Sequence, residues 1–269
     1  MAFKPFLFAA DLDGTLLPNT SKEPPNGCIE RTRGLLQFLL ANDCPVCYIS
    51  GRYLDLAREG RKVFNLPVPT YWVCNVGSEI YDQFGRAHKA WGDLLGTPFD
   101  HEGMWRAVAD IDDGLQPQEQ EKQGPHKFSM YYPQAAPLTL QNDLLRRLRT
   151  FRHGIRLIHS VEETSGKGLL DVLPDNAGKA PALLFLAKSH SKPPRRTFFA
   201  GDSGNDLDAL TSGVCGAMVG NAPPELRSYA RDLQVRTAGS HLYVAKDFYG
   251  DGVIEGLKVF RLLPQAQEF

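Results

Sequence analysis

Two aspartates, Asp11 and Asp13, stand one residue apart in "FAADLDGT", just where an apolar run ends. Two carboxylates this close repel each other, and at a buried strand end they are destabilising unless a cation or protonation relieves the repulsion. The following Gly14-Thr15 pair allows a tight turn whose backbone N–H groups can face an anion. The spacing therefore predicts a site that holds a cation next to an anionic ligand.

A second acidic stretch, "FFAGDSGNDLDAL", repeats this design far downstream. An apolar strand at 197–200 leads into Asp202, Asn205 and Asp206, and then into a helix. Ligands of open α/β sheets collect where parallel strands end, so we expect the two acidic loops to meet at one sheet edge. Clustered carboxylates at such an edge suit Mg²⁺, which prefers a few carboxylates together with waters and substrate phosphate.

These residue types fit phosphoryl transfer. With the cation in place, one aspartate can attack a phosphoryl group while another exchanges protons with the leaving oxygen and the attacking water. Ser50 in "YISGR" can donate a hydrogen bond to a phosphate oxygen, and Lys179 in "NAGKAPAL" can neutralise its charge. The alternatives are a turn residue for Ser50 and a solvated helix residue for Lys179.

The stretches "DLDGT", "SGR", "GKAPAL" and "GDSGND", in this order, resemble the four motifs of the haloacid dehalogenase superfamily of phosphotransferases. The resemblance implies that Asp11 is the nucleophile and Asp13 the general acid and base. It implies a magnesium site formed by Asp11, the backbone carbonyl of Asp13, and Asp202, with Asp206 orienting a metal-bound water. The phosphate-binding residues would be Thr15, Ser50, Lys179 and Asn205.

Further stretches resemble the sucrose-phosphate phosphatase subfamily over nearly the whole chain: "YWVCNVGSEIY" (71–81), "HKFSMYY" (126–132), "LLDVLP" (169–174) and "DGVIEGL" (251–257). In that subfamily a cap domain, inserted between the second and third motifs, closes over a sugar phosphate and selects it. Its members act on disaccharide phosphates such as sucrose 6-phosphate or mannosylfructose phosphate. Lys127 is the candidate sugar contact, with a solvent-facing strand residue as the alternative.

The predicted elements place these motifs on an α/β fold, a parallel-sheet Rossmann-like haloacid dehalogenase core with an inserted α+β cap. Apolar runs that read as strands lie at 6–10, 45–50, 71–75, 196–200 and 215–220, and stretches with helical spacing lie at 29–42, 53–64 and 178–190. We expect residues 1–82 and 169–269 to form the core domain and residues 83–168 to form the cap.

Within the predicted cap, "SEIYDQFGRAHKAW" (78–91) reads as a hairpin that turns at Gly85. "KFSMYY" (127–132) places Phe128, Met130 and Tyr132 on one face of a strand. The segment "QPQEQEKQGP" (116–125) reads as a polar, mobile loop.

Composition limits the possible partners. The 30 basic and 31 acidic residues give a net charge of −1, which provides no field for nucleic acid or an anionic membrane. No run resembles a signal peptide or a membrane span, which predicts a soluble, cytoplasmic protein, with a monomer favoured. The five cysteines, an odd number in a chain of this length, form no disulfide framework. Cys44 and Cys47 have the spacing of a redox or metal pair, but on a predicted buried strand they face opposite sides, which favours two separate core residues.

The sequence therefore predicts a Mg²⁺-dependent phosphatase of a small-molecule sugar phosphate, acting through an aspartyl-phosphate, with sucrose 6-phosphate as the leading substrate. Other glycosyl phosphates, such as mannosylfructose phosphate or glucosylglycerol phosphate, stay open as substrates. A sugar phosphomutase shares the nucleophile but must keep water away from the intermediate. A sugar-phosphate sensor without catalytic turnover is the non-enzymatic alternative.

Overall fold

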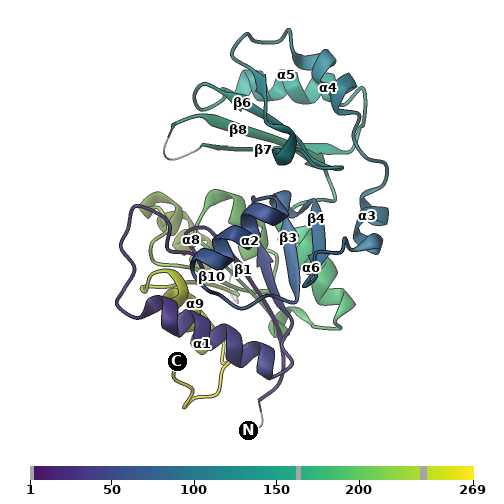
Figure 1. Ribbon diagram of the computed structural model, residues 1–269. Coiled ribbons are helices and arrows are strands. Elements are labelled where there is room, and N and C mark those ends of the chain that lie inside the picture. The colour runs from purple at the N-terminus through teal and green to yellow at the C-terminus, as the bar shows by residue number, and fades with distance from the viewer. Residues whose placement is uncertain (1–2, 162–164, 237–240) are drawn as a thin grey trace.

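The computed structural model describes residues 3–161, 165–236 and 241–269. They form a seven-stranded sheet of order β11-β10-β9-β1-β2-β3-β4 and a four-stranded sheet of order β5-β6-β8-β7. Figure 1 shows the large sheet with its helices in the lower body and the small sheet with α4 and α5 above it.

The seven-stranded sheet is parallel except at one edge, where β4 runs antiparallel to β3. Its strands are β1 (Leu7–Asp11), β2 (Val46–Ile49), β3 (Tyr71–Cys74), β4 (Glu79–Asp82), β9 (Thr197–Gly201), β10 (Cys215–Met218) and β11 (Leu242–Val244). Alternate residues of β1 enter two separate apolar clusters, Phe8 and Ala10 on one face and Leu7 and Ala9 on the other. The near-continuous apolar strands follow from burial on both faces.

Helices cover both faces of this sheet. On the face of Phe8 lie α1 (Cys28–Ala41), α2 (Leu54–Val63) and α9 (Tyr249–Val259). On the face of Leu7 lie α3 (Lys89–Leu95), α6 (Lys179–Ser189), α7 (Leu207–Leu210) and α8 (Pro224–Arg236). The predicted fold class is confirmed, with strands and helices close to the expected positions.

The four-stranded sheet is antiparallel and has two unlike faces. Its strands are β5 (Gln116–Pro117), β6 (Phe128–Tyr132), β7 (Ile155–Val161) and β8 (Gly168–Pro174). Phe128 and Met130 pack against α4 (His101–Val108) and α5 (Leu138–Leu148), with Tyr132 partly buried beside them, so the predicted apolar face of β6 is confirmed. Because strand side chains alternate, Ser129 and Asp171 face the other way.

The predicted cap boundaries need correction. The stretch 168–174 was expected in part to belong to the core, but as β8 it pairs with β7 and β6 in the small sheet. The helix α3 lies inside the predicted cap range, yet its Trp91 and Leu95 pack into the core of the large sheet. The apolar core around the small sheet therefore runs from Phe99 to Val172. The predicted domain ranges also include residues 1–2, 162–164 and 237–240, which lie outside the described residues, and the division into core and cap domains stays a prediction.

One smaller prediction was confirmed in part and another was wrong. The hairpin predicted at 78–91 turns at Gly85 (φ +88°) as expected, with an antiparallel bridge from Tyr81 to Ala87, but its second half is short because α3 begins at Lys89, and β4 pairs chiefly with β3. The polar segment 116–125 contains β5 and the short helix η2 (Gln120–Lys122). Its polar side chains contact the small sheet, so low hydrophobicity did not mean an absence of structure.

The remaining sequence-level expectations concern cysteines, charge and membranes. All five cysteines are buried and unpaired, and Cys44 and Cys47 belong to opposite apolar clusters as predicted.

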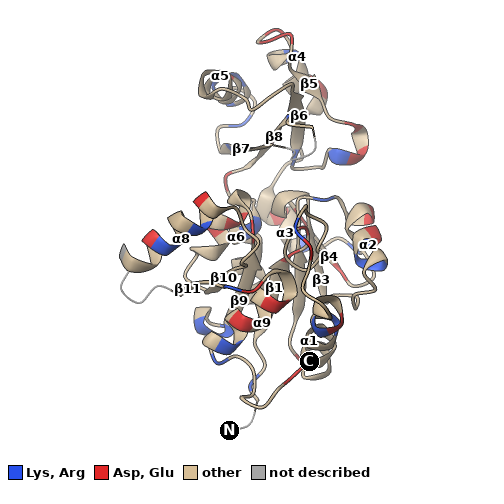
Figure 2. Cartoon of the chain, turned by 90° about the vertical axis from the view of Figure 1, so that its left-hand side faces the viewer, with Lys and Arg blue, Asp and Glu red and all other residues tan. Residues whose placement is uncertain are grey.

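Acidic and basic residues are interspersed along outer helices such as α2 and α8 (Figure 2). Among the described residues, no helix combines the length and apolar character needed to cross a membrane.

Candidate active site

The site lies at the carboxyl edge of the large sheet, where β1 runs between β9 and β2. Asp11 ends β1, Asp202 follows β9, and Ser50 follows β2. Neighbouring parallel strands bring these residues together although they come from distant parts of the chain. This edge is also where the strand order changes direction, which is the usual ligand position in open α/β sheets.

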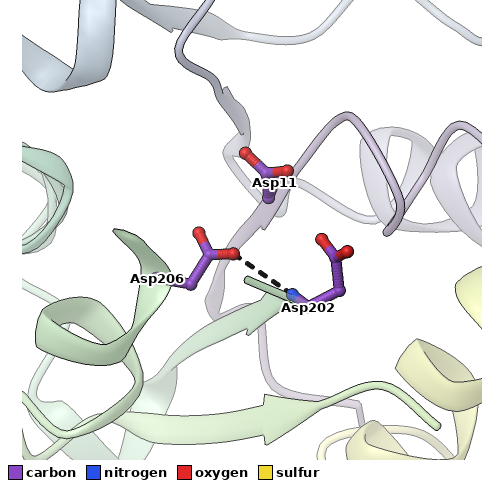
Figure 3. Close-up of side chains that lie close together, drawn as sticks. All are labelled: Asp11, Asp202 and Asp206. Atoms are coloured by element: carbon purple, nitrogen blue, oxygen red, sulfur yellow. Dashed lines mark hydrogen bonds between the residues drawn. The ribbon is translucent and has the colours of Figure 1, made fainter. Parts of the chain in front are cut away.

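Three buried aspartates form the centre of the site (Figure 3). Ligand oxygens of Asp11, Asp202 and Asp206 all lie within 4.8 Å of one another. Burial raises the pKa of Asp11 well above its usual value, against the opposing effect of Lys179. Burial and the neighbouring Asp206 raise the pKa of Asp202 to about 7. The crowded carboxyl groups therefore need positive charge beside them to be ionised at neutral pH.

Lys179 supplies part of that charge. Its Nζ donates to Asp11 Oδ1 and to Asp206 Oδ1, each at 2.7 Å, and the residue is only 1% exposed. Burial opposes the charge on Lys179, but the two aspartates outweigh it and raise the pKa of the lysine. Lys179 is therefore a buried cation bound to the predicted nucleophile, and its alternative as a solvated helix lysine is wrong.

Asp206 holds the second acidic loop together. Its Oδ2 accepts hydrogen bonds from the backbone N–H groups of Asp202 (3.1 Å) and Ser203 (3.0 Å) and from the Ser203 hydroxyl (2.9 Å). With Oδ1 bound to Lys179, both carboxylate oxygens have protein partners. Asp206 thus fixes the lysine and the loop, and its predicted contact with a metal-bound water stays a prediction.

The structure corrects the predicted role of Thr15. Its hydroxyl donates to Asp202 Oδ1 at 3.0 Å, its backbone N–H donates to the Leu12 carbonyl at 3.3 Å, and the residue is fully buried. Thr15 therefore orients Asp202 instead of meeting a phosphate. The neighbouring Gly14 (φ +73°) leaves room for that carboxylate, because a Cβ there would lie 2.2 Å from Asp202 Oδ2.

Asp13 points into the cavity from the loop after β1 and is held by two residues that the sequence analysis missed. Arg52 Nε and Nη2 donate to its two oxygens at 2.8 and 2.6 Å, and Asn19 Nδ2 donates to Oδ1. The signal for Arg52 was present in "SGR", where only the serine was assigned a role.

The two remaining phosphate candidates differ in their position, because Asn205 lines the cavity whereas Ser50 is buried behind its lining. Ser50 is 1% exposed, and its Oγ accepts a hydrogen bond from the Arg52 backbone N–H at 3.1 Å. Asn205 lines the cavity, and its Oδ1 accepts a hydrogen bond from the Ser203 hydroxyl at 2.8 Å. Their contacts with phosphate stay predictions.

A cavity of about 530 Å³ lies between the two sheets. On the large-sheet side its lining includes Asp11, Asp13, Lys179, Asp202 and Asn205, and on the small-sheet side Gln118, Lys122, Lys127, Ser160 and Asp171. The acidic centre thus faces a wall of hydrogen-bonding side chains. A polar molecule with one anionic end fits this arrangement.

Lys127 lies in that wall and is only 4% exposed, so the alternative of a solvent-facing residue is wrong. Its Nζ lies 3.5 Å from Asp171 Oδ1, and the same oxygen accepts a hydrogen bond from the Ser129 hydroxyl at 2.6 Å. Asp171 was missed because a single acid inside an apolar strand carries no recognisable spacing. The sugar contact of Lys127 stays a prediction.

A fourth missed residue, Asn75, lines the cavity from the turn after β3. It begins the short helix η1 (Asn75–Gly77), where Asn75 and Val76 have φ values of +49° and +58°. This backbone conformation is strained for a β-branched residue, and such strain is concentrated at functional sites. Asn75 Nδ2 donates to Glu79 Oε2 at 2.9 Å, which fixes the amide and leaves Oδ1 buried without a partner among the described residues.

A parallel sheet with a buried Asp-Lys pair at the end of its first strand and a second acidic loop beside it is the arrangement expected of the haloacid dehalogenase fold, and the chain has that fold. The model of the sucrose-6F-phosphate phosphohydrolase family matches residues 4–261, and the chain belongs to that family.

Known relatives agree with this assignment. A haloacid dehalogenase-like hydrolase of Nitrosococcus oceani is 34% identical over 94% of this chain and 71% of its own length. Sucrose-phosphatase 1 of Nicotiana tabacum is 28% identical over 97% of this chain, which spans only 60% of that protein. The mannosylfructose-phosphate phosphatase of Agrobacterium fabrum is 28% identical over 96% of this chain and 98% of its own length.

A solved structure is similar over nearly the whole chain. The sucrose-phosphatase of Synechocystis sp., in complex with sucrose and phosphate, superposes with a TM-score of 0.78 at 28% identity, covering 97% of this chain and 100% of that one.

Proposed function

We propose that the protein releases phosphate from a disaccharide phosphate such as sucrose 6-phosphate, in a Mg²⁺-dependent reaction through an aspartyl-phosphate on Asp11. The observation that carries the proposal is the buried pair of Asp11 and Lys179 facing a polar cavity across from Lys127 and Asp171. One end of the cavity suits a phosphoryl group and the other suits a polyol.

The geometry supports a two-step reaction. The Asp11 carboxylate forms a bond to phosphorus while the bond from phosphorus to the leaving oxygen breaks, and Asp13 donates a proton to that oxygen. Water then attacks the aspartyl-phosphate, Asp13 takes a proton from the water, and the bond between Asp11 and phosphorus breaks. Lys179 neutralises charge beside the transferring group throughout.

The acidic centre also fits a divalent cation. Asp11 and Asp202 are hard oxygen donors, burial raises the pKa values of both, and Gly14 leaves room for the Asp202 carboxylate beside the loop after β1. These two carboxylates, with the backbone carbonyl of Asp13, would hold Mg²⁺. When bound, the ion would neutralise phosphoryl oxygens and lower the pKa values of the carboxyl groups around it.

The wall formed by the small sheet supports a sugar as the leaving group. Gln118, Ser160 and Asp171 offer donors and acceptors that match hydroxyl groups, and Lys122 and Lys127 add further hydrogen-bond donors on the same wall. Relatives that act on sucrose phosphate and on mannosylfructose phosphate both align over nearly the whole chain, which supports a disaccharide phosphate. The buried, unpaired cysteines support a reducing compartment such as the cytoplasm.

The test is phosphate release from sucrose 6-phosphate, mannosylfructose phosphate and glucosylglycerol phosphate, with Mg²⁺ and with a chelator. We expect Mg²⁺-dependent release from at least one of them. The Asp11→Asn variant should lose roughly 10³-fold or more of the rate, because the nucleophile is removed. Asp232→Asn, on the outer helix α8, is the matched control and should keep the wild-type rate.

Four outcomes would reject the proposal. An inert wild-type protein, or an Asp11→Asn variant with full activity, would remove the catalytic assignment. Turnover of sugar bisphosphates without free phosphate would favour the phosphomutase, and calorimetric binding without any hydrolysis would favour the sensor.

A further inference from the structure

The contact between Asp13 and Arg52 is more elaborate than a surface ion pair. Both terminal oxygens of Asp13 accept from one guanidinium at 2.8 and 2.6 Å, and Asn19 adds a third donor. Asn19 is itself fixed, because its Oδ1 accepts from the Gly14 backbone N–H at 3.1 Å. Asp13, Asn19 and Arg52 all line the cavity.

Arg52 is anchored at several points. Its Nη1 donates to the Leu56 carbonyl at 3.0 Å, and its backbone N–H donates to Ser50 Oγ at 3.1 Å. The helix α2 makes room for the guanidinium at Gly60, where a Cβ would lie 2.8 Å from Arg52 Nη1. A planar guanidinium held in this way presents two parallel donors in one fixed orientation, which a lysine cannot do.

Asp13 needs hydrogen-bonding partners that fix its orientation, because its side chain is partly exposed. Its side chain is 39% exposed on a loop, in contrast to the buried Asp11. Proton transfer to a leaving oxygen requires the carboxyl group within about 2.6–3.2 Å of that oxygen, and a freely rotating side chain meets this requirement only part of the time.

We propose that Arg52, assisted by Asn19, is a positioning residue that holds the Asp13 carboxyl group in the orientation for proton transfer to and from the reacting oxygens. The inference rests on the proposed function, since it assumes that Asp13 is the general acid and base. It assigns Arg52 a role through Asp13 and not a contact with the phosphoryl group or the sugar.

If Arg52 positions Asp13, the effect of replacing Arg52 on the rate of the first step should depend on the leaving group of the substrate. In the first step the bond from phosphorus to the leaving oxygen breaks, and a sugar alkoxide must receive the proton from Asp13. A para-nitrophenolate leaves as a stable anion and does not need that proton. In the second step, the attack of water on the aspartyl-phosphate needs Asp13 as the base for either substrate.

The experiment follows both steps by rapid mixing of the Mg²⁺-loaded enzyme with sucrose 6-phosphate or para-nitrophenyl phosphate. With Arg52→Met we expect the first turnover of the sugar phosphate to slow by roughly 100-fold or more, the magnitude typical of general acid catalysis. With the aryl ester we expect a burst of nitrophenolate close to the wild-type rate, followed by slow steady-state turnover. KM for the sugar phosphate should change by less than about threefold, and Arg52→Lys should recover part of the rate.

Controls separate this role from others. Asn19→Ala should show the same pattern with a smaller loss, and Arg58→Met, on the following helix α2 and paired with exposed Asp55, should behave as the wild type. A reduced burst amplitude together with a lower melting temperature in both Arg52→Met and Arg52→Lys would indicate a structural role and overturn the inference. An equal loss in the burst rate of both substrates, or a large rise in KM, would show direct substrate contact and overturn it as well.

Failure of the proposed function gives a different result from failure of the positioning role. If the proposed function is wrong, the wild-type enzyme does not release phosphate from any of the sugar phosphates. If the wild type is active and Arg52→Met is unaffected on the sugar phosphate, the positioning role alone is wrong.

Discussion

At the scale of single residues, the site combines buried carboxyl groups with a buried lysine of opposite charge. Asp11, Asp202 and Asp206 crowd together, and Lys179 bonds two of them. Breaking a buried ion pair leaves an uncompensated charge, which is far more destabilising than the loss of an exposed pair. The same residues that are proposed to carry out catalysis therefore determine local stability, and stability measurements can test their arrangement.

Lys179→Met should lower the free energy of unfolding by about 3–5 kcal/mol at neutral pH, because Asp11 and Asp206 lose their shared cation. Chemical denaturation with and without Mg²⁺ measures the loss. Lys188→Met, an exposed position on the same helix α6, is the control and should stay within about 0.5 kcal/mol of the wild type. Equal stability of the two variants would contradict the buried ion pair.

The thermal stabilisation by Mg²⁺ should grow with pH. The folded-state pKa of Asp202 is raised to about 7, above its value of about 3.9 in the unfolded chain. Without a cation, the stability contributed by this group is therefore complete below about pH 4 and is lost as the pH rises through about 7. Mg²⁺ binds the ionised form, so the difference in melting temperature between Mg²⁺ and chelator should be small at pH 5 and largest at pH 8.

Melting curves across this pH range provide the measurement. Asp202→Asn, which cannot ionise at this position, should flatten the pH dependence. A Mg²⁺ effect of the same size at pH 5 and pH 8 in the wild type would contradict the assignment.

At the scale of elements, the site depends on close packing between loops at the strand ends. Gly77, at the end of η1 after β3, lies against the turn that begins α6. A Cβ at Gly77 would lie 2.2 Å from the carbonyl carbon of Gly178 and 2.7 Å from the backbone nitrogen of Lys179. The absence of a side chain at Gly77 therefore lets the loop after β3 pack directly against the backbone of Gly178 and Lys179.

Gly77→Ala should reduce both stability and activity, because the new methyl group displaces the start of α6 and moves Lys179 away from Asp11. Gly213→Ala is a close control: its φ of +90° matches the +87° of Gly77, but its Cβ would meet nothing within 4 Å. Both variants should lose about 1–3 kcal/mol from backbone strain, and Gly77→Ala roughly 1–3 kcal/mol more from the collision. Denaturation and steady-state kinetics test this, and equal effects of the two substitutions would refute the packing argument.

At the scale of the whole molecule, the small sheet presents its polar face to the carboxyl edge of the large sheet (Figure 1). The two bodies also touch beside the start of α6, where Arg156 on β7 lies next to Gly178 and 3.5 Å from Asp208 on α7. The acidic centre meets the phosphoryl group in our proposal, while the opposite wall meets the sugar. Phosphate chemistry and sugar selection should therefore be separable by mutation.

Lys127→Met should lower kcat/KM for the sugar phosphate by about 10- to 100-fold, the cost of one hydrogen bond to a charged group. Turnover of para-nitrophenyl phosphate, which lacks a sugar, should stay near the wild-type rate. Lys167→Met, an exposed position just before β8, is the control. Because Asp171 loses its cationic partner in this variant, the melting temperature must be measured alongside the kinetics. An equal loss of activity on both substrates would contradict a role of Lys127 in sugar selection.

The sequence by itself determined the large parallel sheet and most of the acidic centre. These predictions depended on local patterns: an apolar run forms a strand, and an acid directly after it lies at the carboxyl edge. The order of the motifs then identified Asp11, Lys179 and Asp202, and the structure brings these three residues together.

Only the tertiary structure decided which distant groups meet. Thr15 bonds to Asp202 across 187 positions of the chain, and Arg52 bonds to Asp13 across 39, and neither residue's own neighbourhood reveals its partner. The strand β8 has the same apolar character as the strands of the large sheet, so its pattern could not show that it pairs with β7. Local sequence fixes the kind of element and its chemistry, whereas pairing depends on packing between segments far apart in the chain.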